Sequence, residues 1–250
     1  MQSDAQTLRE MGLRLNGGDN PPELGISYGS RKLGRDVDLL FVFKGIPVAK
    51  NIVQGQYDLS QVDYEDFSFR LGNWDIEYTE PVLTGEYIFG NAELLEKARE
   101  FLNTGKPTPE NLDYMGKRAL ETYLQAEMLY SQGKNELFNG RVNSRETFNG
   151  LTRELVGVRD FEFESPIISK ALSQLTYTLS YIASRGRYSL GEREVTLKGI
   201  LESPVSRCEA ELVGLMRYFK SRDETQKIVM SEVNRRFENT KSLLIREAMF

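Results

Sequence analysis

The chain has 250 residues, a net charge of −5 and an isoelectric point near 5.2, and it contains one cysteine and no histidine. The lack of histidine excludes Ser-His-Asp and Cys-His catalysis and zinc sites that need imidazole ligands. A single cysteine excludes an internal disulfide. The chemistry that remains open is that of carboxylates, metal ions and phosphates.

The cysteine content and the hydropathy of the chain predict where the protein works. The single cysteine, Cys208, and the absence of an apolar segment at the start of the chain favour a reducing cytoplasm. Cys208 shares helical spacing with Leu212, Leu215 and Phe219, so we expect a buried thiol rather than a nucleophile. No stretch reaches the roughly 18 consecutive apolar residues of a membrane span, and no membrane partner is expected.

In chain order, the first predicted elements are a helix over residues 4–15 and two strands over 24–28 and 36–43. Leu8 and Met11 lie on one stripe of the helix, which Asn-Gly-Gly ends. The second strand is a nearly continuous apolar run, which is typical of a strand covered on both faces. The residues between the two strands therefore form a connection that both strands position.

This connection holds the most informative motif, Gly29-Ser30 followed by Asp36-Val37-Asp38. Side chains two apart on a strand project to the same side, so Asp36 and Asp38 form a carboxylate pair about 7 Å apart. Such a pair is unfavourable without a cation, and oxygen ligands suit Mg²⁺ bound together with substrate phosphates. Gly29 permits close approach of the backbone to a phosphate, and the Ser30 hydroxyl can donate to its oxygens.

The arrangement resembles the signature of the nucleotidyltransferase superfamily that includes DNA polymerase beta, poly(A) polymerases and antibiotic nucleotidyltransferases. The resemblance covers about residues 5–90 and implies that Gly29 and Ser30 hold a nucleoside triphosphate. It also implies that Asp36 and Asp38 bind two Mg²⁺ ions together with a third carboxylate from a later strand.

A predicted hairpin supplies the candidates for this third carboxylate. Residues 66–71 and 74–79 alternate apolar and polar around Gly-Asn, a two-residue hairpin connection. The polar face would carry Asp75 and Glu77, each between apolar neighbours. We favour Asp75 because its shorter side chain holds a ligand more rigidly. In the alternative, Asp75 only pairs with Arg70 across the hairpin.

The rest of the chain is predicted to be a polar loop over residues 44–65, a helix from Asn91 to Phe101, and helices throughout the second half. The predicted fold is α+β, with a nucleotidyltransferase domain on a small mixed sheet at 1–105 and an all-helical domain at 106–250. The helices of the second domain are predicted at residues 109–132, 144–157, 166–184, 193–201, 205–222 and 224–248.

These patterns together predict a Mg²⁺-dependent enzyme that moves a nucleoside monophosphate from a triphosphate to an acceptor hydroxyl. Asp36, Asp38 and Asp75 are the predicted catalytic and metal-binding residues, with Glu77 as the reserve ligand. The acidic isoelectric point favours a small cationic acceptor over RNA or a protein. The alternative is a catalytically silent nucleotide-binding protein that regulates or docks a partner. The sequence leaves the nucleotide, the acceptor and the oligomeric state open.

Overall fold

The computed structural model divides into two compact units, Met1–Pro107 and Thr108–Phe250, each with buried hydrophobic residues of its own. None of the described helices is long and apolar enough to cross a membrane. The described residues are 2–15, 20–28, 37–47, 51–54, 57–138, 166–191, 197–220 and 230–248.

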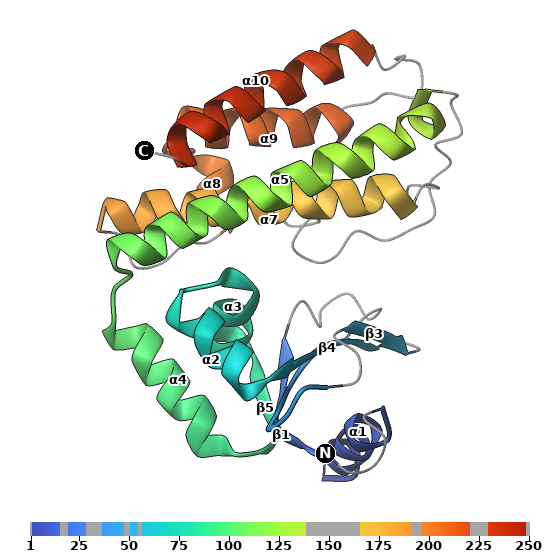
Figure 1. Cartoon of the computed structure of the whole chain (residues 1–250), viewed down its shortest axis with the longest axis vertical. Helices are drawn as coiled ribbons and strands as arrows, with labels where there is room; N and C mark the ends of the chain where they lie inside the picture. The colour runs from blue at the N-terminus through green and yellow to red at the C-terminus, as the bar shows by residue number, and fades with distance from the viewer. Residues whose placement is uncertain are drawn as a thin grey trace. The chain divides into compact units, whose positions relative to one another are not determined.

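The N-terminal unit is built on a five-stranded mixed sheet with helices on both faces (Figure 1). The strand order is β3-β4-β2-β1-β5, in which β2 and β4 run parallel and the other neighbouring pairs are antiparallel. The elements are α1 (Gln2–Leu15), β1 (Pro22–Tyr28), β2 (Val37–Phe43), β3 (Asn51–Gln54), β4 (Tyr57–Asp63), α2 (Tyr64–Gly72), α3 (Ile76–Thr84), β5 (Glu86–Gly90) and α4 (Ala92–Thr104).

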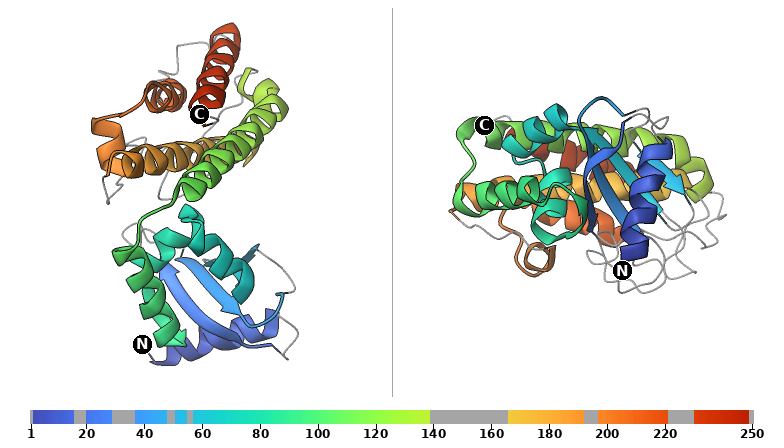
Figure 2. Two further views of the ribbon diagram at one scale, coloured as in Figure 1. Left: turned by 60° about the vertical axis from the view of Figure 1, so that its left-hand side comes forward. Right: turned by 90° about the horizontal axis from the view of Figure 1, so that it is seen from below.

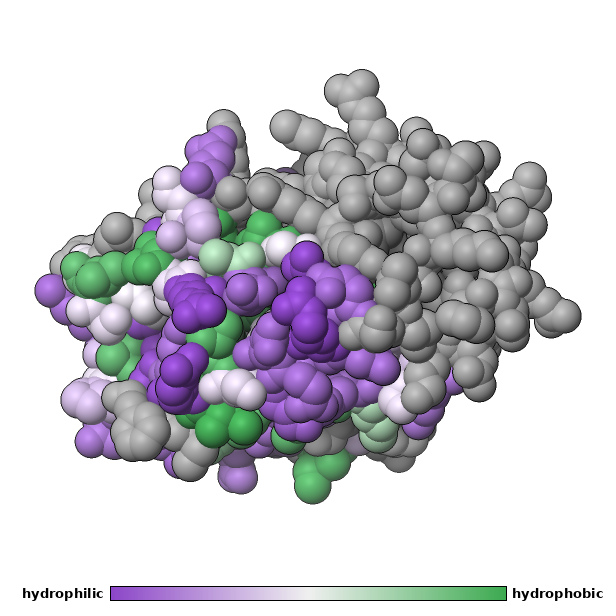
Figure 3. Space-filling view, turned by 90° about the horizontal axis from the view of Figure 1, so that it is seen from above, coloured by the Kyte–Doolittle hydropathy of each residue, from purple (hydrophilic) through white to green (hydrophobic). Residues whose placement is uncertain are grey.

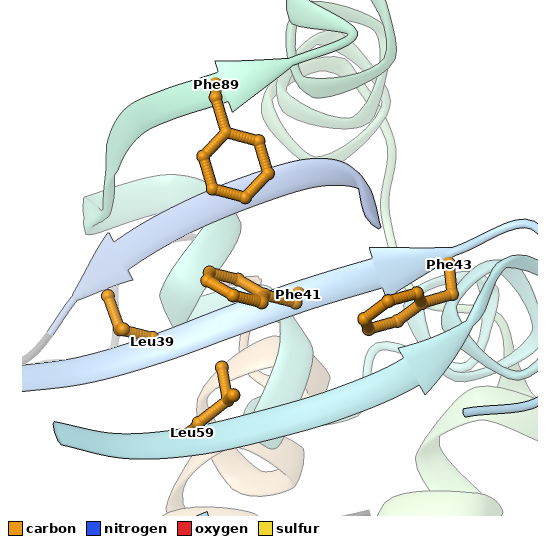
Figure 4. Packing of buried hydrophobic residues seen from close by; sticks show 5 residues of the cluster. All are labelled: Leu39, Phe41, Phe43, Leu59 and Phe89. Atoms are coloured by element: carbon orange, nitrogen blue, oxygen red, sulfur yellow. The ribbon is translucent and has the colours of Figure 1, made fainter. Parts of the chain in front are cut away.

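One face of the sheet packs against α1. Alternate residues of β2 meet side chains of β4 and β5 in one buried cluster (Figure 4): Leu39, Phe41, Phe43, Leu59 and Phe89. The rings of Phe41 and Phe89 meet edge to face with centroids 5.1 Å apart. Leu8 and Met11 of α1 cover the cluster, as their spacing on one helical stripe predicts.

The other face of the sheet carries the intervening residues of the same strands. Ile26 of β1 and Leu40 and Val42 of β2 are buried there. Helix α3 packs on β1, and α2 packs on β2 and β4. Figure 2 shows the sheet between α1 on one side and α2 and α3 on the other. Because β2 is covered on both faces, its apolar run is nearly continuous.

The predicted hairpin over residues 66–71 and 74–79 is wrong, because the chain forms the helices α2 and α3 there. Asp63 begins α2 by accepting a hydrogen bond from the backbone N–H of Asp66 at 2.9 Å. Phe67 and Leu71 are buried one helical turn apart, whereas Phe69 is exposed. Burial therefore follows the helical period and not the alternation of a strand.

The Gly-Asn pair ends a helix instead of joining two strands. The Asn73 side chain donates to the Phe69 carbonyl at 2.8 Å, and its backbone N–H bonds carbonyls of the last turn of α2. Trp74 then takes a left-handed conformation with φ 58°. Its buried ring lies 5.8 Å from the ring of Phe101 in α4, centroid to centroid. Asp75 caps α3.

The predicted loop over residues 44–65 is also wrong in part, because it contains the strands β3 and β4. The two strands run antiparallel, and their pairing extends from Gln54 with Tyr57 to Asn51 with Ser60. The helix α4 begins after Asn91, whose side chain accepts from Leu94 N–H at 3.1 Å, as predicted. Strand β4 extends the sheet beyond β2 and places a further set of polar side chains beside it.

The C-terminal unit is helical throughout its described part, and with the sheet it confirms the predicted α+β class. Its elements are α5 (Pro109–Phe138), α7 (Pro166–Ser189), α8 (Leu197–Glu202), α9 (Arg207–Lys220) and α10 (Met230–Ala248). They correspond to five of the predicted helices, while the helix predicted over residues 144–157 lies outside the described residues.

Hydrogen bonds and an ion pair connect the helices of this unit. The hydroxyls of Thr122 in α5 and Thr178 in α7 lie 2.9 Å apart, and Lys241 of α10 pairs with Glu127 of α5 at 2.8 Å. Cys208 is buried, as its helical spacing predicts, and burial raises the pKa of its thiol to about 12. Figure 3 shows one face of the molecule, on which hydrophilic residues alternate with hydrophobic areas over the described residues.

We predict that Gly90→Ala destabilises the N-terminal unit by about 2 kcal/mol or more. Gly90 has φ +95°, and a Cβ there would lie 2.0 Å from the carbonyl oxygen of Glu23. Urea unfolding followed by the fluorescence of Trp74, the single tryptophan of the chain, measures this unit directly. The control is Gly72→Ala at the end of α2, where nothing lies within 4 Å of the new Cβ. It should leave stability unchanged or raise it by up to about 1 kcal/mol.

Candidate active site

The predicted phosphate and metal motif falls where the antiparallel strands β1 and β2 are joined. Tyr28 ends β1, Val37 begins β2, and the two strands pair directly. Gly29, Ser30 and Asp36 lie in residues 29–36, outside the described residues. Asp38 is described and lies on β2, so the structure locates one member of the predicted carboxylate pair.

Asp38 belongs to a row of polar side chains that crosses the three central strands. Its partner on β1 is Tyr28, and its partner on the parallel strand β4 is Asp58. Directly paired residues project to the same face of a sheet, on strands about 4.8 Å apart. We call Tyr28, Asp38 and Asp58 the carboxylate row. It places two acidic side chains from different strands beside each other.

The carboxylate row lies on the sheet face that packs against α3, at one end of a buried apolar layer. The next row on this face pairs Ile26 with Leu40, and the row after that pairs Leu24 with Val42. All four of these side chains are buried. The polar row therefore marks the point at which the hydrophobic layer of this face ends.

The electrostatic environment of Tyr28 shows which groups gather at this point. Burial is the main reason why the pKa of the Tyr28 hydroxyl is raised well above its usual value, and the charge of Asp38 raises it further. Asp58 and Glu80 of α3 act in the same direction, while a hydrogen bond with Ser60 opposes them. Negative charges on β2, β4 and α3 thus all favour the neutral form of this hydroxyl.

Asp58 was missed by sequence reasoning because residues 44–65 were assigned to a loop. A usable signal exists in Tyr57-Asp58-Leu59, an acid between apolar neighbours, which is the pattern sought in the hairpin. A second signal is Gly55-Gln56, a two-residue connection before this segment. The pairing of Asp58 with Asp38 depends on a parallel contact between distant residues, and no local pattern reveals it.

The two acids chosen from the predicted hairpin lie on helix α3 instead. Asp75 caps this helix: its Oδ1 accepts the backbone N–H of Glu77 at 3.1 Å, and its Oδ2 lies 3.4 Å from Arg70 Nη1. The Glu77 carboxylate lies 3.6 Å from the same nitrogen. Asp75 therefore does pair with Arg70, although between two helices and not across the predicted hairpin. A metal-binding role for Asp75 or Glu77 stays a prediction.

Arg70 is the centre of this second cluster. Its Nε lies 3.1 Å from Asp66, and its guanidinium lies 5.2 Å from the ring centre of Tyr78. Burial raises the pKa of the Tyr78 hydroxyl to about 12, against the opposing charge of Arg70. The cluster joins α2 to α3 through ion pairs and a capped helix start. These contacts give the side chains of the cluster a structural role.

The donor set of the carboxylate row fits a divalent cation. Among the described residues no three acidic or cysteine side chains lie close enough together to hold a metal ion. Asp38 and Asp58 supply two carboxylates, and Asp36 precedes Asp38 by two residues. Oxygen-only ligands suit Mg²⁺, and a cation relieves the repulsion between directly opposed like charges.

No protein-family model matches the sequence, and no curated protein matches it. Among solved structures, the chain is similar to a nucleotidyltransferase-like protein from Exiguobacterium sibiricum. The two share 13% identity over 98% of this chain and 74% of that one, with a TM-score of 0.38. No residue role is carried from that protein to this one.

We predict that Asp75→Ala destabilises the N-terminal unit by about 1 to 3 kcal/mol, since it removes a helix cap and one carboxylate partner of the partly buried Arg70. Asp75→Asn should cost about 1 kcal/mol, because asparagine also caps helices and Arg70 keeps two other carboxylates. Urea unfolding followed by Trp74 fluorescence measures both. Glu93→Ala, which removes an exposed ion pair with Lys97 in the same unit, should leave the curve unchanged. Equal stability of Asp75→Ala and the wild type would contradict this structural role.

Proposed function

We propose that the N-terminal unit is the catalytic domain of a metal-dependent nucleotidyltransferase. It would move a nucleoside monophosphate from a nucleoside triphosphate to an acceptor hydroxyl. One observation carries the proposal: Asp58 on β4 stands in register with Asp38 on β2. This register adds a carboxylate from a neighbouring strand to the Asp36-Val37-Asp38 motif that follows Gly29-Ser30. That combination is what a metal-assisted phosphoryl transfer needs from its protein.

In this proposal Asp36, Asp38 and Asp58 hold Mg²⁺. When bound, the metal supplies Lewis acid chemistry that lowers the pKa of the attacking hydroxyl and neutralises the pyrophosphate that leaves. Asp38 and Asp58 come from two strands that are hydrogen-bonded to each other, so the sheet fixes their separation. Rigid placement favours an in-line geometry between acceptor and phosphate. No histidine base is needed.

Gly29 and Ser30 are proposed to bind the triphosphate. They follow directly after Tyr28, which is paired with Asp38, so the backbone leaves the sheet beside the proposed metal ligands. The described ends of β1 and β2 bring this connection to the carboxylate row. Backbone N–H groups and the Ser30 hydroxyl would donate to phosphate oxygens there.

The acceptor is proposed to be a small cationic molecule rather than RNA or a protein. The chain has 32 basic against 37 acidic side chains, which disfavours a broad surface for nucleic acid. Pyrophosphate release from each ribonucleoside triphosphate, measured with aminoglycosides, an RNA oligonucleotide or the protein itself as acceptor, tests this choice. A melting temperature raised by triphosphate and Mg²⁺ without release in any assay would instead favour a silent nucleotide-binding protein.

We predict that Asp38→Asn and Asp58→Asn each lower Mg²⁺-dependent turnover by about a hundredfold or more, since loss of an anionic ligand misplaces the reacting oxygen. Stability should hold or rise as repulsion between the carboxylates is relieved. Pyrophosphate release and melting temperature are measured together. Asp113→Asn, at an exposed Asp paired with Lys117 in the helical unit, serves as the matched control and should keep wild-type turnover.

Asp75→Asn belongs in the same series because it was the third ligand predicted from sequence. If Asp58 is the third ligand, Asp75→Asn should keep most of the turnover despite its lower stability. If Asp58→Asn is active while Asp75→Asn is folded but inactive, the third ligand is Asp75 and not Asp58. Full turnover in Asp38→Asn would end the proposal.

A further inference from the structure

The sheet face that carries the proposed site is ordered in rows. The carboxylate row stands at its end, and the next row consists of Ile26 on β1, Leu40 on β2 and Ser60 on β4. Ser60 follows Asp58 by two residues, so both project to the same face. Ser60 is the polar member of a row whose other two members are buried and apolar.

The Tyr28 side chain connects these two rows. Its hydroxyl shares a hydrogen bond with the Ser60 hydroxyl, although the two residues lie on strands separated by β2. Two strand spacings amount to about 10 Å, so the phenol ring has to lie across β2 to make this bond. On β2 the residue directly opposite Tyr28 is Asp38, and Leu40 is the next residue of β2 on the same face.

We propose that Tyr28 is a positioning residue of the site, and that its bond to Ser60 holds the phenol ring as a wall behind the Asp38 and Asp58 carboxylates. This inference rests on the proposed function, because it concerns the same metal ligands. The ring fills the inner side of the row, so the Asp38 carboxylate is directed away from the apolar layer. Asp58 is constrained in the same way by Ser60, its neighbour on β4.

The physical basis is that the Asp38 and Asp58 side chains would lose conformational freedom before the metal ion binds. An aspartate at the end of a sheet samples several rotamers, and a ligand fixed in one of them binds a cation more tightly. Groups that orient metal ligands without touching the metal commonly change its affinity 10- to 100-fold when they are removed. A phenylalanine ring at position 28 would keep nearly the same volume but would lose the hydrogen bond to Ser60 on β4.

The test compares Tyr28→Phe, Ser60→Ala and the double variant, with Mn²⁺ as the probe. Each keeps both carboxylates and the ring, and each deletes the hydroxyl–hydroxyl bond. The matched control is Tyr87→Phe, because the Tyr87 hydroxyl lies in the same sheet and donates to the Gly90 carbonyl at 2.9 Å. Mn²⁺ affinity is measured by the electron paramagnetic resonance signal of the free ion, and melting temperature is measured alongside.

We expect each single variant to weaken Mn²⁺ binding about tenfold, while Tyr87→Phe binds Mn²⁺ like the wild type. The double variant should bind no more weakly than either single variant, because both delete the same bond. Ser60→Ala, at a partly exposed residue, carries the test if Tyr28→Phe does not fold.

Two results would overturn the inference, and they are distinguishable. If Asp38→Asn loses Mn²⁺ and Tyr28→Phe keeps wild-type affinity, Tyr28 does not position the ligands and the proposed function stands. If the wild type itself binds no Mn²⁺, the metal site and the inference both fail. An equal loss in Tyr87→Phe would also overturn the inference, since the effect would then be general to the sheet.

Discussion

The parallel register of β2 and β4 is the constraint on which the rest of the N-terminal unit depends. It sets Asp38 beside Asp58 and, on the opposite face, Leu39 beside Leu59. A slip of β4 by one residue would turn Asp58 toward α1 and move Leu59 out of the apolar cluster to the other face. The hydrophobic layers therefore hold the carboxylates in place. Packing energy on one face of the sheet maintains the placement of the acidic side chains on the other.

The two clusters of acidic side chains in this unit differ in the charges and polar groups around them. Around Arg70, carboxylates meet a guanidinium and a helix start, and their charges are compensated within the protein. In the carboxylate row, Asp38 and Asp58 face each other beside a neutral phenol. Like charges in register on neighbouring strands repel each other, and a bound cation would relieve this repulsion, which is the basis of the proposed site.

Secondary structure was predicted correctly where the hydrophobic pattern fitted only a helix or only a strand, and wrongly where it fitted both. The helices of the C-terminal unit and the strands β1 and β2 have unambiguous patterns, and the structure confirms them. In residues 66–78 the alternation of Phe67, Phe69 and Leu71 suggested a strand, although Phe67 and Leu71 alone also fit one turn of a helix. The N-caps at Asp63 and Asp75 favour helices over strands in this segment. The β2–β4 pairing joins distant segments and leaves no local pattern, so Asp58 could not be paired with Asp38 in advance.

The left-handed backbone of Trp74 makes the junction of α2 and α3 dependent on a third element. A bulky residue in this conformation carries about 1 to 3 kcal/mol of strain, which persists only while the indole is held against Phe101 of α4. Loosening α4 would release the turn, and with it the orientation of α3, whose Glu80 contributes to raising the pKa of Tyr28. Helix α4, which contributes no residue to the carboxylate row, thus helps to hold α3 in its place against β1.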